Sequence, residues 1–222
     1  MTAKPNHPRL LNTVAHGQTK SSSMSKMMKK MAMVENLMAK RPSGSITGSL
    51  PHSKGSCFTG EVRRGARDDR LLADLLQDAT DLTVYEVEDK DPLTPGTVHI
   101  APANYHVLIE DGYASLNIDA PVRFSRPSID VMFTSAADIY GPAVIGVVLT
   151  GANEDGARGL AHIVKHGGRA LVQNPKTAEI PIMPTAAIRA VSSAEVLSLD
   201  GLVARLIELS ASQARVGAGR AE

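Results

Sequence analysis

Several common features are scarce or absent in this chain of 222 residues. Its single cysteine, Cys57, excludes an internal disulfide framework and is typical of a reducing compartment. No apolar run approaches the roughly 20 residues that a membrane-spanning helix needs. The basic N-terminus also lacks the apolar stretch of a secretory signal. Aromatic residues make up only 3% of the chain, so we expect a core of Val, Ile, Leu and Ala. The sequence therefore predicts a soluble cytoplasmic protein that does not insert into a membrane.

Motifs for metals and cofactors are also missing. The seven histidines and the one cysteine form no HExxH or CxxC pattern. The turn at Gly151 has neither the Lys-Ser/Thr ending of a phosphate-binding loop nor the three glycines of a dinucleotide site. We therefore predict no metal site and no cofactor.

The net charge of +1 conceals a division of the chain. Residues 1–67 contain twelve Lys or Arg and two acidic residues, whereas the remainder contains twelve basic and twenty-one acidic residues. Seven of the nine methionines also lie in the first 38 residues. We predict a basic, Met-rich arm over residues 1–68 that is disordered or translated from a shifted reading frame. A folded domain over residues 69–211 and a flexible tail over residues 212–222 follow.

The folded domain has the pattern of an α/β protein. Residues 143–149 (AVIGVVL) are almost all apolar, which predicts a strand in the middle of a sheet covered on both faces. A helix over residues 157–166 and a strand over residues 169–173 follow. This order predicts right-handed crossovers in a doubly wound, mainly parallel, Rossmann-like sheet. Ligands bind beyond the carboxyl ends of such strands, in loops like residues 150–156.

Asp155 is the best candidate in that loop. It lies on a Gly-flanked turn after the predicted central strand, and a helix begins directly after it. A carboxylate there can accept backbone amides at the helix start and stay ionised. Two interpretations are open: Asp155 orients a histidine in a Ser-His-Asp arrangement, or it is a helix N-cap. Spacing alone favours the cap.

Other residues of these loops have a structural interpretation, in some cases beside a functional one. Met183 opens a short helix, where its backbone N–H could stabilise an oxyanion, but a core Met before a first-turn proline is the simpler interpretation. Arg126 could reach a substrate or only form a surface ion pair. Ser128 or Asp130 could cap the helix that follows. His106 alternates with apolar residues in a strand, a position that is usually structural.

Five segments, taken in order, resemble motifs of the CheB family, the protein-glutamate methylesterases of bacterial chemotaxis. They are residues 95–102 with His106, 126–137, 145–157, 167–173 and 183–187. Each motif is weak alone, but five in register are highly specific, and the similarity covers roughly residues 69–201.

The resemblance implies a Ser-His-Asp enzyme that hydrolyses γ-glutamyl methyl esters, and deamidates glutamines, on the cytoplasmic helices of methyl-accepting chemotaxis receptors. It places the triad aspartate on Asp155 and the oxyanion position on Met183, although Ile182 replaces the usual glycine. His106 and Arg126 are candidate substrate-loop residues. Since no receiver domain is recognised, we expect a separate response regulator or methyltransferase as a partner.

The family's first segment is not recognisable. The family begins with an apolar strand, a Gly-Ala-Ser turn and a second strand that ends in the catalytic His, which should fall near residues 62–65 (Val-Arg-Arg-Gly). Ser45 and His52 are too close together to match. We therefore predict a sheet that is incomplete at its N-terminal βα units and an impaired enzyme in which only the triad aspartate is identified.

Two other functions remain open. The chain could be a non-catalytic scaffold that binds receptor-like helices, with the basic arm as an added contact. It could also be a nucleic-acid binder through that arm, but the arm has almost no aromatic residues for base stacking. We therefore do not expect nucleic acid as a partner.

Overall fold

The computed structural model describes residues 10–16, 56–62, 73–74, 77–78, 82–94, 96–123 and 125–218. For residues 10–16, 56–62 and 210–218 it describes the backbone but not the side chains.

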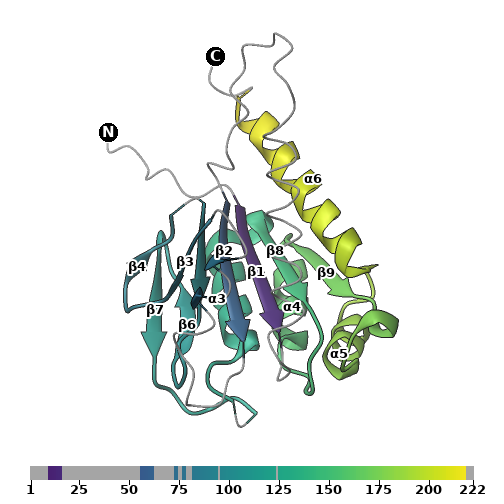
Figure 1. The fold of residues 1–222 in the computed structure, drawn as a ribbon, viewed down its shortest axis with the longest axis horizontal. Helices are drawn as coiled ribbons and strands as arrows, with labels where there is room; N and C mark the ends of the chain where they lie inside the picture. Colours follow the sequence, from purple (N-terminus) through teal and green to yellow (C-terminus); the bar gives the residue numbers. More distant parts are fainter. Residues whose placement is uncertain are drawn as a thin grey trace.

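A seven-stranded sheet, parallel throughout, forms the centre of this part of the chain (Figure 1). In spatial order its strands are β10 (Glu195–Leu197), β9 (Arg169–Gln173), β8 (Val144–Val148), β1 (Leu10–His16), β2 (Ser56–Val62), β5 (Thr97–Ile100) and β3 (Thr83–Glu86). The predicted parallel α/β sheet is thus confirmed, with β8, the apolar run, near its middle.

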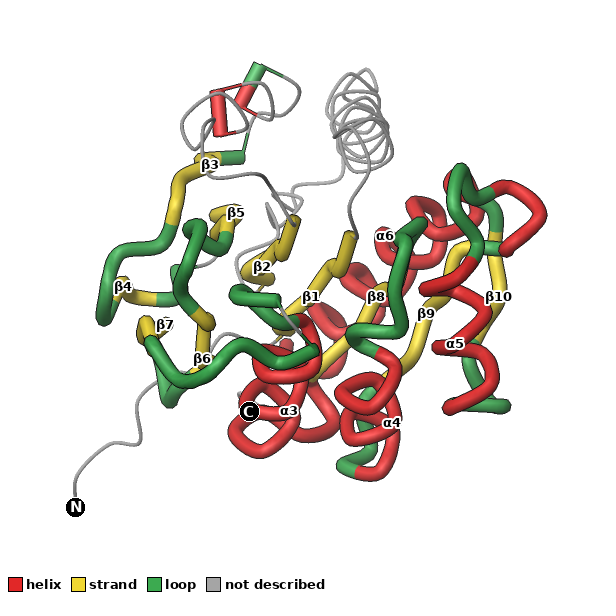
Figure 2. Tube along the Cα trace, turned by 90° about the horizontal axis from the view of Figure 1, so that it is seen from below, coloured by secondary structure: helices red, strands yellow, loops and turns green. Residues whose placement is uncertain are grey.

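Helices cover both faces of this sheet (Figure 2). They are α3 (Ile129–Tyr140), α4 (Ala157–Lys165), α5 (Ile182–Ala190) and α6 (Leu199–Ala218), with the short 3-10 helices η1 (Gly141–Ala143) and η2 (Pro175–Thr177). Figure 2 views the sheet from its carboxyl edge, with α3 and α4 on one side and α6 on the other. The helical span of α6 includes residues 212–218, where the sequence predicted a flexible tail.

The side chains of β8 alternate between two cores. Val144 and Val148 pack in the core that α3, α4 and α5 cover. Ile145 and Val147 pack in the other core, together with Leu202 and its neighbours on α6. Because both faces of the strand are buried, neither can carry polar residues, which explains the unbroken apolar run.

Glycine allows α3, α4 and β8 to approach closely. A Cβ atom at Gly146 in β8 would lie 2.7 Å from side-chain carbons of Leu160 and Ile163. A Cβ atom at Gly159 in α4 would lie 2.6 Å from the Cβ of Phe133 in α3. Both distances are shorter than carbon atoms tolerate, so a Cβ atom at either position would force its neighbours to shift.

A second, antiparallel sheet lies beside β3 in Figure 1. Its strands are β4 (Asp91–Pro92), β7 (Tyr113–Asn117) and β6 (His106–Ile109), in that order. Strands β6 and β7 form a hairpin, and Gly112 takes a positive φ of 89° in its turn.

The predicted gap at the N-terminal end of the sheet is wrong. β1 lies between β8 and β2, with Ala15 opposite Val148 and His16 opposite Val62. Without β1, both β8 and β2 would present unpaired edges in the middle of the molecule. The sequence Leu10–His16 (LLNTVAH) includes three polar residues, so its apolar pattern is too weak to identify a central strand. The remaining residues of the predicted arm lie outside the described residues.

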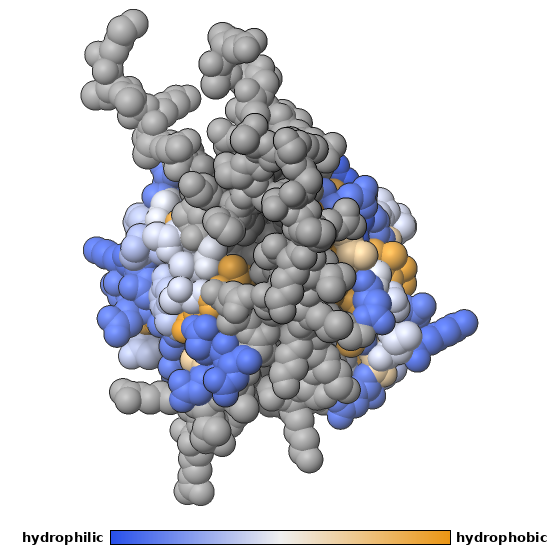
Figure 3. Space-filling model, turned by 45° about the horizontal axis from the view of Figure 1, so that its top comes forward, coloured by the Kyte–Doolittle hydropathy of each residue, from blue (hydrophilic) through white to orange (hydrophobic). Residues whose placement is uncertain are grey.

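On the face shown in Figure 3, the described residues are mainly hydrophilic, and the hydrophobic ones form small, separate patches. Among the described helices, none combines the length and the apolar character needed to cross a membrane.

Candidate active site

The order in which successive strands are added to the sheet reverses between β1 and β8, although all strands are parallel. From β1 the next strand, β2, lies on one side, whereas from β8 the strands β9 and β10 follow on the other side. In open α/β sheets, such a switch point leaves a crevice beyond the carboxyl ends of the strands, where ligands bind. Since Ala15 is opposite Val148, the chain leaves β1 and β8 at nearly the same level. The loop after β8, which contains Asp155, is therefore at the expected place for a site.

Asp155 is completely buried and accepts four hydrogen bonds. Its Oδ1 accepts from the Ser128 hydroxyl at 3.0 Å, from the Asp130 amide at 3.1 Å and from the Gly156 amide at 3.0 Å. Its Oδ2 accepts from the Ile129 amide at 2.9 Å. No histidine donates to it among the described residues.

Asp155 therefore caps a helix, but not the helix that follows it in sequence. Its carboxylate binds the first amides of α3, about 25 residues away, whereas at the start of α4 it binds only the amide of Gly156, the residue before the helix. The sequence predicted the kind of contact correctly and the helix incorrectly, because spacing along the chain reveals only local partners.

Burial raises the pKa of Asp155 above its usual value, because a charged carboxylate loses its water. The amides of Asp130 and Ile129 oppose this effect, and the Ser128 hydroxyl does so to a smaller extent. The negative charge of nearby Asp130 adds to the rise.

Asp130 makes the reciprocal contact. Its buried carboxylate accepts from the Gly159 amide in the first turn of α4 at 2.8 Å, and from Arg158 Nε at 2.9 Å. α3 and α4 thus each receive a carboxylate from the other's segment. From the sequence, either Ser128 or Asp130 was expected to cap α3; instead Asp130 caps α4, and Ser128 donates to Asp155.

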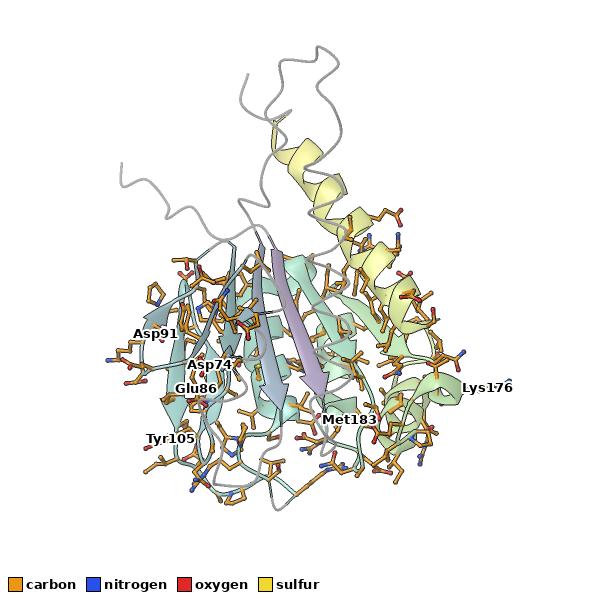
Figure 4. The ribbon with its side chains drawn as sticks, viewed as in Figure 1. Asp74, Glu86, Asp91, Tyr105, Lys176 and Met183 are labelled. Atoms are coloured by element: carbon orange, nitrogen blue, oxygen red, sulfur yellow. The ribbon has the colours of Figure 1, made fainter. Side chains whose placement is uncertain are left out.

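Met183 fastens the loop of α5 to the loop after β8. Its backbone N–H donates to the Gly151 carbonyl at 3.0 Å, and the Gly151 amide donates to Ile180 O at 3.1 Å. Its side chain is buried against Gly151, where a Cβ atom would lie 2.6 Å from Met183 Cε. Figure 4 shows Met183 at the carboxyl edge of the sheet. Because the N–H already has an acceptor, the oxyanion role of Met183 stays a prediction, and the contacts present are structural.

Two buried polar side chains that the sequence did not single out hold the same loop. Gln173, at the end of β9, accepts from the Thr150 amide at 2.9 Å and donates to Thr177 O at 3.0 Å. The Thr150 hydroxyl accepts from the Ile180 amide at 2.8 Å. The only sequence signal for this role was their position, since Gln173 ends one apolar strand and Thr150 lies just after another.

His106 and Arg126 meet at another loop. His106 Nε2 lies 3.3 Å from Ala120 O, and Arg126 Nη1 donates to Ile118 O at 2.6 Å and Asp119 O at 3.0 Å. Both side chains therefore fix residues 118–120, and neither has a described hydrogen bond to Asp155. Their predicted role as substrate-loop residues stays a prediction.

Glu154 lies at the exposed rim beside Asp155. It forms ion pairs with Arg123, at 3.3 Å, and with Arg189 on α5, at 3.8 Å. All three side chains are at least 40% exposed, so these pairs contribute little to stability. They do give the rim alternating charge.

The residues that follow β1 and β2 in sequence lie outside the described residues, as do Ser45 and His52. After His16 the chain reads Gly-Gln-Thr, without a Gly-x-Ser. After Val62, residues 63–70 (RRGARDDR) contain no histidine. The nucleophile and the base therefore remain unassigned.

The fold and the position of Asp155 define an α/β protein with a candidate site at the switch point of a doubly wound sheet. The family model described as CheB methylesterase matches residues 57–206. The chain belongs to this family. The match begins within β2, so it extends into the segment that the sequence assigned to the basic arm.

Curated relatives carry consistent names. A putative protein-glutamate methylesterase/protein-glutamine glutaminase of Leptospira interrogans is 47% identical over 166 residues, which cover 74% of this chain and 86% of that protein. The protein-glutamate methylesterase FrzG of Myxococcus xanthus is 40% identical over 138 residues, which cover 62% of this chain and 41% of FrzG. A methylesterase/glutaminase of Xanthomonas euvesicatoria is 32% identical over 187 residues, covering 82% of this chain and 48% of that protein.

Among solved structures, the CheB methylesterase catalytic domain of Thermotoga maritima matches with a TM-score of 0.75. The match covers 90% of this chain and 98% of that domain at 24% identity, and it supports the fold.

Proposed function

We propose that this protein is a protein-glutamate methylesterase and glutamine deamidase that acts on the cytoplasmic helices of chemotaxis receptors. The observation that carries the proposal is the buried, fully positioned carboxylate of Asp155 at the switch point of a CheB-family sheet. The names of the relatives supply the substrate class.

The chemistry requires three groups. A hydroxyl attacks the γ-carbonyl carbon of the esterified glutamate, the C–O bond to the methoxy group breaks and methanol leaves. Water then hydrolyses the acyl-enzyme to free glutamate and hydroxyl. An imidazole accepts and returns the protons in both steps, and a carboxylate orients it.

Asp155 suits the third role because its two oxygens differ. Oδ1 already has three donors, whereas Oδ2 has only the Ile129 amide among the described residues. A carboxylate oxygen has two lone pairs, so Oδ2 can accept one further donor, such as an imidazole N–H. The three donors on Oδ1 prevent the carboxylate from turning away.

The carboxyl edge also offers surface for a receptor helix. Tyr105 follows β5 and is 41% exposed, and Ile182 begins α5 and is 48% exposed. Figure 4 shows Tyr105 at the same edge of the sheet as Met183, the neighbour of Ile182. Large apolar side chains at this edge, next to the charged rim around Glu154, suit an amphipathic helix. A separate response regulator or receptor methyltransferase is a further proposed partner.

The test is methanol release from a methyl-esterified receptor fragment. If the wild type releases methanol, Asp155→Asn should lower the rate by roughly 10³–10⁴-fold while a circular dichroism spectrum verifies the fold. Glu154→Gln, which removes the adjacent exposed carboxylate, serves as the matched control and should leave the rate almost unchanged. Full activity in a folded Asp155→Asn variant would remove Asp155 from the mechanism.

A second function is favoured by a specific observation: no Gly-x-Ser follows β1, and residues 63–70 contain no histidine. A chain without nucleophile and base would bind receptor helices without hydrolysing them. This alternative predicts no methanol release from the wild type, together with retention of the receptor fragment on immobilised protein.

A further inference from the structure

Three side chains that can bind a metal ion converge where α3 and α4 end. Asp138 comes from the last turn of α3, His162 from α4, and His166 from the residue that ends α4. One ligand atom from each lies within 4.8 Å of the other two. His162 Nε2 is 2.6 Å from Asp138 Oδ1, and His166 Nε2 is 3.6 Å from the same oxygen.

The backbone prepares one imidazole for coordination. His166 Nδ1 lies 2.9 Å from the carbonyl oxygen of His162, which can only accept a hydrogen bond. Nδ1 must therefore carry the proton, and Nε2 of the neutral ring keeps its lone pair on the side of Asp138. Histidines that bind metals commonly donate their second ring N–H to a backbone carbonyl in this way.

The three side chains are reachable from solvent. Asp138 is 53% exposed, His162 is 29% exposed and His166 is 34% exposed. A cation can therefore enter without opening the fold, and water can complete its coordination. The two imidazole rings lie side by side, with centroids 4.2 Å apart.

We propose that Asp138, His162 and His166 form a binding site for a divalent transition-metal ion of the zinc type. Two imidazoles and one carboxylate suit zinc, nickel, cobalt or copper ions, whereas magnesium and calcium prefer oxygen ligands only. Bonds of about 2.0–2.1 Å in a tetrahedral site place neighbouring ligand atoms about 3.3 Å apart. The two separations from Asp138 Oδ1, 2.6 and 3.6 Å, lie on either side of this value. All three ligand atoms lie within 4.8 Å of one another, so side-chain rotations can bring them to this spacing.

The site has a structural role. At their N-terminal ends, Asp130 and Asp155 tie α3 and α4 together. Asp138 lies eight residues further along α3 than Asp130, which is about 12 Å along the helix axis. The metal ion is therefore remote from Asp155 and fastens the opposite end of the helix pair.

Titration of the purified full-length protein with zinc chloride, after removal of metals by a chelator, tests the proposal. Isothermal calorimetry should detect one site, and the double variant His162→Ala/His166→Ala should lose it. Asp138→Asn should weaken it by about ten-fold or more, since one of three ligands becomes a poor one. Lys165→Ala, an exposed change on the same helix, is the matched control and should bind as the wild type does.

Thermal unfolding provides a readout that is independent of calorimetry. At a zinc concentration a hundred-fold above the Kd, the melting temperature should rise by roughly 5–10 °C in the wild type and not in the double variant. Melting of the chelated double variant verifies that it is folded. Zinc binding by the folded double variant with unchanged affinity would overturn the proposal, because the ion would then be bound elsewhere, for example by the other five histidines or by Cys57. An absence of zinc binding by the wild type would also overturn it.

Discussion

Carboxylates join α3 to the α4 segment at both ends of this helix pair, in opposite environments. Asp155 is fully buried, and its donors are backbone amides and one hydroxyl that the fold holds in place. Asp138 is half exposed, and its partners are two imidazoles. Surroundings decide the use of a carboxylate: fixed donors in a dry site position it, whereas exposed imidazoles make it a potential metal ligand.

The largest expected effect comes from removing the buried carboxylate. Asp155→Ala leaves the α3 amides and the Ser128 hydroxyl without an acceptor, so the free energy of unfolding should fall by roughly 2–5 kcal/mol. Urea unfolding followed by circular dichroism measures the loss. A loss below about 1 kcal/mol would mean that water replaces the carboxylate easily and that the two ends of the pair differ little.

The next effect tests the close packing that brings both ends together. Gly159→Ala places a methyl group 2.6 Å from Phe133 Cβ and 3.0 Å from Asp130 Cα, and should destabilise the protein by about 1–3 kcal/mol. Gly201→Ala in α6 is the control. Its methyl group would lie 3.3 Å from the nearest atom, Leu197 Cβ, so the change should stay within about 1 kcal/mol. Equal effects in urea unfolding would contradict the packing argument.

A smaller effect is expected at the exposed end. Without metal, Asp138→Asn removes a hydrogen bond between partly exposed side chains and should change the free energy of unfolding by less than about 1 kcal/mol. The same variant should lose about half or more of the stabilisation by zinc, because an affinity that is ten-fold lower reduces RT ln(1 + L/Kd), where L is the zinc concentration, by that much at a hundred-fold excess. A loss as large as that of Asp155→Ala in chelated protein would show that the Asp138 contact contributes as much as the buried one.

The smallest expected effect is on the pH dependence of the free energy of unfolding. Because the pKa of Asp155 is raised above 3.8, the folded protein binds more protons than the unfolded chain between that value and the folded pKa. The contribution of Asp155 to stability therefore falls as the pH rises through this window. The free energies of unfolding of the wild type and of Asp155→Asn can be measured at several pH values from about 3.5 upward. As the pH rises, the difference between them should change in favour of the variant. A change in favour of the wild type would mean that the helix amides lower the pKa of Asp155 by more than burial raises it.

Elements with a clear pattern among neighbouring residues could be predicted from sequence, and elements without one could not. The apolar run of β8, the helix α4 that follows it and the strand β9 are local patterns, and all three were predicted. β1 was missed because Asn12, Thr13 and His16 interrupt its apolar pattern. Its place in the sheet depends on pairing with β2 and β8, which are distant in sequence.

The contacts of the candidate site also fall into those that the sequence reveals and those that it does not. The sequence predicted that Asp155 lies in a loop after a central strand, and the strand order shows this strand, β8, next to β1 at the switch point. It could not find the contact between Asp155 and the start of α3, because the two segments meet only when the sheet is assembled. The spacing of His162 and His166 is visible along α4, but Asp138 joins them from another helix.

The order of apolar strands, helices and turns was enough to predict the α/β class of this protein and the loop that carries Asp155, since periodicity and turn chemistry are properties of neighbouring residues. The place of β1 in the sheet, the helix that Asp155 caps and the side chains around Asp138 follow only from the assembled fold. These contacts join segments separated by up to about 130 residues, and only the packing of both cores brings such segments within hydrogen-bond distance.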